Sequence, residues 1–100
     1  MAEKMIHSYE TIFIIDASLE EDSIKALTEK FTALISKNGT LESVDEWGKR
    51  RLAYEIKDRT EGFYVLVDFK ADADFPKELD RQYKITEGIL RTIIIRKDEE

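Results

Sequence analysis

The chain has 100 residues and a formal net charge of −6; 42% of its residues are hydrophobic and 38% are charged. It contains no cysteine, which excludes disulfides, thiol catalysis and zinc sites with Cys ligands. No segment is apolar enough over a sufficient length to serve as a signal peptide or to span a bilayer, so we expect a cytoplasmic protein without membrane contact. A chain of this size forms one domain. We therefore expect a single domain over residues 1–100, with an ordered core from about residue 5 to residue 97 and a short acidic C-terminal tail.

Charge is unevenly distributed along the sequence. Residues 1–48 carry ten acidic and four basic side chains, whereas residues 49–100 carry twelve of each. A polyanion responds to the local potential rather than to the total charge, so the acidic net charge does not exclude RNA as a partner. Eight of the twelve basic residues of the second half form two groups, Lys49, Arg50 and Arg51 in one and Arg81, Lys84, Arg91, Arg96 and Lys97 in the other.

The first element is a predicted strand over residues 6–15, where aromatic and β-branched residues dominate. It ends in IFII, which is apolar at every position and therefore typical of a central strand covered on both faces. A helix follows, because Ser18 and Glu21 have the spacing of a capping box and Gly39 is suited to a left-handed C-terminal cap. The expected buried stripe of this helix is Ile24, Leu27, Phe31, Leu34 and Ile35.

The second predicted strand covers residues 40–56 and carries a lone Gly48, which predicts a β-bulge. The segment 57–62 reads as a hairpin turn. The third strand, residues 63–71, is almost continuously apolar, as central strands are.

A short helix is predicted next, with Pro76 at its first position and Asp74 or Phe75 as its cap. Leu79 and Tyr83 are expected to face the core, and the helix should end near Ile85. The last predicted strand covers residues 89–96.

The resulting order, β-α-β-β-α-β, is that of an α+β ferredoxin-like sandwich: a four-stranded antiparallel sheet with two helices on one face. In this fold the first and third strands are central and the second and fourth are edges. Composition alone also makes the first and third strands the most buried, so two separate arguments agree.

Both faces of this sheet are apolar by period-two counting. We expect the apolar side chains of one face to form the core under the helices. Those of the other face, which the helices leave uncovered, are expected to form a docking surface for a partner. Alternatively, the uncovered face is an ordinary protein surface, which is always partly apolar. An error of one residue in the register would exchange the two sets of side chains between the faces. The first set is Phe13, Ile15, Phe63, Val65, Val67 and Phe69; the second is Ile12, Ile14, Tyr64, Leu66, Ile93 and Ile95.

The run Lys49, Arg50 and Arg51 lies on an expected edge strand and has two interpretations. Charges on an edge block pairing with stray strands. Arginine side chains can instead bind phosphates or the carboxylates of a protein partner. We expect the cations to gather along one margin of the sheet, but charge alone does not choose between these roles.

Catalytic and metal-binding motifs are missing from the sequence. His7 is the only histidine and has no candidate triad partners, and no run of acids has calcium-loop spacing. Acylphosphatases share this small fold, but the loop from Asp16 to Glu21 has neither glycine nor a cation to bind phosphate. The RNA recognition motif also shares the strand order, yet its basic first position is Glu61 in this chain. We expect no enzyme activity, no metal, no cofactor and no small-molecule substrate.

Four segments closely resemble the protein-six family of the bacterial small ribosomal subunit: YETIFII, EWGKRRLAYEIK, EGFYVLVDF and ILRTIIIR, at residues 9–15, 46–57, 61–69 and 89–96. The resemblance covers about residues 5–97. It implies the ferredoxin-like fold and a structural role in assembly of the subunit's central domain. It also implies binding to small-subunit ribosomal RNA together with small-subunit protein eighteen, as a heterodimer.

The resemblance further implies that the basic positions contact RNA or the protein partner. A protein-interaction module without RNA contact is the main alternative, and a phosphate-ester enzyme is the third. The residues expected to make the RNA or partner contacts are Lys49, Arg50, Arg51, Arg81, Lys84, Arg91 and Arg96.

Overall fold

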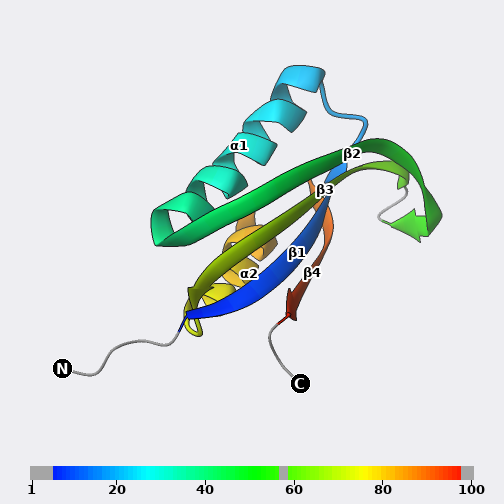
Figure 1. The fold of residues 1–100 in the computed structure, drawn as a ribbon. Helices are drawn as coiled ribbons and strands as arrows, with labels where there is room; N and C mark the ends of the chain where they lie inside the picture. The colour runs from blue at the N-terminus through cyan, green and yellow to red at the C-terminus, as the bar shows by residue number, and fades with distance from the viewer. Residues whose placement is uncertain (1–5, 57–58, 98–100) are drawn as a thin grey trace.

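The computed structural model describes residues 6–56 and 59–97. Its sheet has the strand order β2-β3-β1-β4, every pair is antiparallel, and both helices cover one face (Figure 1). The predicted ferredoxin-like fold is confirmed. The elements are β1 (Ile6–Asp16), α1 (Glu21–Asn38), β2 (Gly39–Ile56), β3 (Arg59–Asp72), α2 (Phe75–Ile85) and β4 (Ile89–Arg96).

The central strands are β1 and β3, as their composition predicted, and β2 and β4 form opposite edges of the sheet. β2 has 18 residues, whereas β4 has 8. The β2–β3 ribbon therefore continues past the ends of β1 and β4 and curves away from them (Figure 1). The expectation that the cations share one margin is wrong, because one basic group lies on β2 and part of the other lies on β4, at the opposite edge.

The core lies between the sheet and the two helices. Phe13 of β1, Phe31 of α1 and Tyr83 of α2 pack ring against ring, with centroids 4.6 to 5.4 Å apart. This cluster places the first predicted apolar set under the helices, because Phe13, Ile15, Val65, Val67 and Phe69 are fully buried and Phe63 packs against the same core. Burial of several large rings is the main source of stability in a chain of this size.

The start of α1 differs from the prediction. The N-cap position is Glu20, and no side chain caps the helix by a hydrogen bond. Ser18 instead donates from its backbone N and its Oγ to Asp16 Oδ1, at 2.9 and 2.7 Å. The predicted capping box is therefore wrong, because an aspartate turn has engaged the serine.

Gly39 also differs from the prediction. Its φ of −166° is extended rather than left-handed, and the residue begins β2. A Cβ at this position would overlap the backbone oxygen of Lys70 on β3. The glycine is required by the close approach of two strands and not by a helix cap.

The hairpin between β2 and β3 is shorter than predicted. β3 already begins at Arg59, so residues 59–62 belong to the strand, while residues 57–58 of the predicted turn lie outside the described residues. α2 contains Pro76 in its first turn and ends at Ile85, as predicted. Asp74 occupies the N-cap position without a side-chain bond, and Asp72 Oδ1 instead accepts from the backbone N atoms of Asp74 and Phe75.

Candidate functional site

The face of the sheet opposite the helices, called the open face here, is built from transverse rows of paired residues. In the central part of the sheet the pairing extends across all four strands, with one register shift in β2 between Glu46 and Gly48. All six residues predicted for docking lie in these rows. The first row is Gly48, Tyr64, Ile14 and Arg91; the second is Asp45, Leu66, Ile12 and Ile93; the third is Ser43, Asp68, Glu10 and Ile95.

The open face leaves large apolar side chains in contact with solvent. Ile93 and Ile95 on the edge strand are 43% and 47% exposed. Ile12, Tyr64 and Leu66 are half-buried, and Ile14 alone is buried. Apolar surface thus extends from β4 to the far side of β3 without a helix above it.

Trp47 joins this surface, although the sequence reasoning missed it. The pairing of β2 with β3 shifts between Glu46 and Gly48, and Gly48 has a positive φ of 83°. The predicted bulge is therefore present, and Trp47 is its extra residue. The indole stacks on Tyr64 with ring centroids 6.1 Å apart and planes 15° from parallel, and it remains 40% exposed.

Carboxylates accompany the apolar rows. Trp47 Nε1 donates to Asp45 Oδ2 at 3.0 Å. In the third row, Asp68 accepts from Lys97 Nζ at 3.0 Å and from Ser43 Oγ at 3.0 Å. The hydrogen bond from Lys97 holds the pKa of Asp68 below its ordinary value, and the same contact raises the pKa of Lys97. The open face is therefore a mixed apolar and acidic surface at its centre.

The three cations of β2 divide between the two faces of the strand. Lys49, Arg50 and Arg51 pair in register with Phe63, Gly62 and Glu61. Because side chains alternate, Arg50 lies on the open face, whereas Lys49 and Arg51 lie on the helix side. All three are exposed, and within residues 6–56 and 59–97 none of them forms an ion pair.

Lys49 faces a groove between α1 and the β2–β3 ribbon, with a volume of about 630 Å³. Leu19, Ile24 and Phe63 supply apolar lining. Glu21, Glu29, Glu46 and Lys25 also line it. Three carboxylates thus share the groove with two ammonium groups, and this net negative lining reduces the attraction of Lys49 for phosphate.

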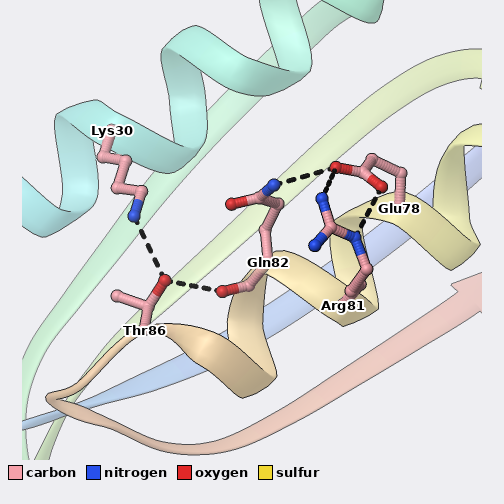
Figure 2. A network of polar contacts seen from close by, with 5 residues as sticks. All are labelled: Lys30, Glu78, Arg81, Gln82 and Thr86. Atoms are coloured by element: carbon pink, nitrogen blue, oxygen red, sulfur yellow. Dashed lines mark hydrogen bonds and ion pairs between the residues drawn. The ribbon is translucent and has the colours of Figure 1, made fainter.

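The cations of α2 are compensated by acids on the same helix. Arg81 Nε and Nη2 donate to the two carboxylate oxygens of Glu78 at 2.9 and 2.7 Å, and Gln82 Nε2 adds a third bond at 2.8 Å (Figure 2). The Arg81 bond and then the Gln82 bond lower the pKa of Glu78 to about 2. Lys84 pairs with Asp80 at 2.9 Å. Both predicted contact residues of α2 are therefore partly neutralised locally.

The same network connects the two helices. Lys30 of α1 donates to Thr86 Oγ1 at 3.2 Å, and that hydroxyl donates to the carbonyl of Gln82 at 2.6 Å (Figure 2). The contacts hold the end of α2 beside α1. Lys30, Gln82 and Thr86 therefore stabilise the packing of the two helices, a role that the sequence did not predict.

The two arginines of β4 lie on different faces. Arg91 pairs with Ile14 and lies on the open face, whereas Arg96 pairs with the buried Tyr9 and lies on the helix side. The seven predicted cations therefore do not form one cluster. Only two of the seven, Arg50 and Arg91, lie on the open face, and they are on opposite edge strands, β2 and β4.

Two classes of site find no support in the described part of the chain. No group of three His, Cys, Asp or Glu residues there is arranged to hold a metal ion. None of its helices has the length and apolar character that crossing a membrane requires.

Sequence comparison decides the family. The family model described as ribosomal protein S6 matches residues 8–96. The chain belongs to the ribosomal protein S6 family. It is thus a structural protein of the bacterial small ribosomal subunit and not an enzyme, which places it in the ribosome and hence in the cytoplasm.

Individual S6 proteins match over almost their whole length. The small ribosomal subunit protein bS6 of Clostridium perfringens is 50% identical over 95 residues, covering 94% of this chain and 100% of that protein. The bS6 of Clostridium beijerinckii is 52% identical over 91 residues, covering 90% and 96%. The crystal structure of 30S ribosomal protein S6 from Thermotoga maritima superposes with a TM-score of 0.88 at 32% identity, covering 93% of this chain and 89% of that one.

Proposed function

We propose that this chain binds small-subunit ribosomal RNA in the central domain together with small-subunit protein eighteen, with which it forms a heterodimer. The observation that carries the proposal is the open face, where Ile93 and Ile95 remain 43% and 47% exposed beside half-buried neighbours on three strands. A monomer rarely leaves such a contiguous apolar surface in water, so a protein partner covers it.

The partner is needed because this chain offers few cations to RNA. Arg50 and Arg51 are exposed and form no ion pair within the described residues, whereas Arg81 and Lys84 are bound to acids of their own helix. Each neutralised phosphate adds to affinity through the release of counterions. Two or three such contacts on a chain of net charge −6 give weak binding alone, so the heterodimer supplies the rest.

The seven cations take different parts in this proposal. Arg50 and Arg51 contact phosphates, and Lys49 supports them from the groove. Arg91 lies beside the partner on the open face, and Arg96 lies at the same edge of the sheet on the helix side. Arg81 and Lys84 contribute less because RNA would have to compete with Glu78 and Asp80. Phosphate contacts of this kind hold an RNA junction in place with little reading of bases.

The test is the affinity for a central-domain RNA junction with and without protein eighteen, measured by filter binding. Affinity should rise at least about tenfold with the partner and fall steeply between about 50 and 200 mM salt. Equal affinity with and without the partner would contradict the proposal.

Charge reversal gives a matched pair of variants. The double change Arg50→Glu with Arg51→Glu should weaken RNA binding by the heterodimer much more than Arg81→Glu with Lys84→Glu, although both alter net charge equally. Circular dichroism and urea denaturation of each variant verify that the fold is retained. Equal loss in both variants would refute the assignment of phosphate contacts to β2.

A second candidate function, a protein-interaction module without RNA contact, is favoured by the carboxylates Asp45, Asp68 and Glu10 on the open face. It predicts a heterodimer that forms normally and is insensitive to RNA or polyphosphate competitors. The same binding series therefore distinguishes the two candidates.

A further inference from the structure

Trp47 is positioned by a backbone feature that serves no other evident purpose in the sheet. It is the extra residue between Glu46, which pairs with Val65, and Gly48, which pairs with Tyr64. The φ of 83° at Gly48 strains any other residue, although an added Cβ there would meet no atom within 4 Å. The glycine is needed for the bulge itself, and the bulge adds an indole to the open face.

The indole is held in place before any partner arrives. One side contacts Tyr64, and Nε1 is bonded to Asp45 Oδ2 at 3.0 Å. A large aromatic side chain with a fixed orientation loses little entropy on binding. Trp and Tyr are also the residue types most enriched among positions that dominate the energy of protein interfaces.

The stacked pair is continuous with the apolar rows. Tyr64 and Ile14 share its row, and Leu66, Ile12 and Ile93 form the next one. Four strands at about 4.8 Å spacing make a strip roughly 15 to 20 Å wide. An α-helix of about 10 to 13 residues has that length, so three turns of helix would cross the sheet.

Charge selects the kind of molecule that covers this strip. Asp45 and Glu10 lie within the rows, and Asp68 is paired with Lys97. Arg91, the one cation of the three rows, lies at their edge on β4. Carboxylates among the apolar residues repel phosphate, which disfavours RNA over these rows. They attract Lys or Arg side chains at the flanks of an apolar stripe.

We propose that Trp47 anchors the open face to an amphipathic helix of a protein partner, whose apolar stripe crosses the strands and whose flanking cations pair with Asp45 and Glu10. The inference rests on the proposed heterodimer and names the anchor and the partner's chemistry at that same surface. RNA contacts Arg50 and Arg51, which lie beyond these three rows, nearer the hairpin between β2 and β3.

The experiment compares two substitutions in the same strand. Trp47 is 40% exposed on the open face, and Val44 is 39% exposed and pairs with the buried Val67 on the helix side. Trp47→Ala should weaken binding to protein eighteen by at least about 30-fold, the size of effect typical of an interface anchor, whereas Val44→Ala should change it less than about threefold. Equal effects of the two substitutions would overturn the inference.

Two further variants keep the test decisive if Trp47→Ala alters the fold. Trp47→Phe retains an aromatic ring over Tyr64 and should recover most of the affinity. Asp45→Asn retains the shape while removing one charge, so it should weaken binding at low salt and less at high salt. An Asp45→Asn variant with unchanged affinity at low salt would refute the basic character assigned to the partner.

Trp47 is the only tryptophan in the chain, so its fluorescence reports occupancy directly. Its emission should shift to the blue when protein eighteen is added, with the Trp47→Phe complex as the blank. Single-stranded RNA alone should leave the emission unchanged, and strong quenching by RNA would overturn the choice of partner. A heterodimer that Trp47→Ala leaves intact would overturn the inference alone, whereas no heterodimer with the wild-type chain would overturn the proposed function as well.

Discussion

The two faces of the sheet carry similar side chains in different surroundings. Phe13 and Val65 on the helix side are fully buried, whereas their neighbours Ile12 and Leu66 on the open face are half-buried. The same strands thus supply both surfaces. Apolar character alone does not make a core; the position of the two helices decides which face is buried and stabilises the fold and which face remains in contact with solvent.

The largest expected effect separates these faces within one strand. Phe13→Ala should lower the free energy of unfolding by about 3 to 5 kcal/mol, because it leaves a cavity against Phe31 and Tyr83. Ile12→Ala should lower it by about 1 to 2 kcal/mol, since its side chain is only half-buried. Urea denaturation measures both, and similar losses would contradict the division into a core face and an open face.

The next effect concerns packing on the open face. A Cβ at Gly62 would overlap Ile14 Cγ2 and lie 3.3 Å from Leu52 Cδ2. Gly62→Ala should therefore lower the free energy of unfolding by about 1 to 3 kcal/mol. A thermal melt of this variant that matches the wild type would show that the open face around Ile14 is loosely packed.

A polar contact on the helix side gives a smaller effect. The hydroxyl of Tyr83 lies 3.0 Å from Thr11 Oγ1, which itself donates to the carbonyl of Ile93. Burial raises the pKa of Tyr83, so the hydroxyl remains protonated and able to donate. Tyr83→Phe should lower the free energy of unfolding by about 1 kcal/mol in urea denaturation, because Thr11 keeps its bond to β4. A loss as large as that of Phe13→Ala would mean that this hydroxyl organises the core.

The smallest effect is electrostatic and lies on the open face. The pKa of Asp68 is lowered chiefly by Lys97, so Asp68 contributes stability above its ordinary pKa of 3.8 that is lost as the pH falls through the lowered value. Lys97→Met should raise the pKa of Asp68 and remove part of that contribution at neutral pH. Carboxyl NMR titration measures the shift, and an unchanged pKa would show that Lys97 does not hold Asp68 in solution.

Much of the fold could be predicted because its strongest signals are periodic. The apolar runs of β1 and β3 identified the central strands, and Pro76 marked the first turn of α2. The start of α1 could not be predicted, because Ser18 fits both a capping box and an aspartate turn, and only the position of Asp16 at the end of β1 selects the turn. Gly39 was assigned to the wrong role because its neighbour Lys70 is distant in the sequence.

The site was predicted less completely for identifiable reasons. Period-two counting placed all six apolar residues on one face, but it assumes regular alternation, and the bulge hid Trp47 from it. The pairing of Arg81 with Glu78 and of Lys84 with Asp80 was readable in principle, since three- and four-residue spacings place side chains together on a helix. The strand order of the fold likewise places β2 and β4 at opposite edges, so the expectation of one basic margin was avoidable.

The left-handed conformation of Gly48 has a consequence for how β2 tolerates changes of length. Deleting Trp47 would leave Glu46 opposite Val65 and Gly48 opposite Tyr64, so Lys49 and Arg50 would keep their present faces. A bulky residue at position 48 would instead favour regular pairing at constant length, and the strand would slide by one position toward the hairpin. Lys49 would then exchange faces with Arg50. Deleting Trp47 should therefore disturb the surface charge pattern of β2 less than a single substitution of Gly48.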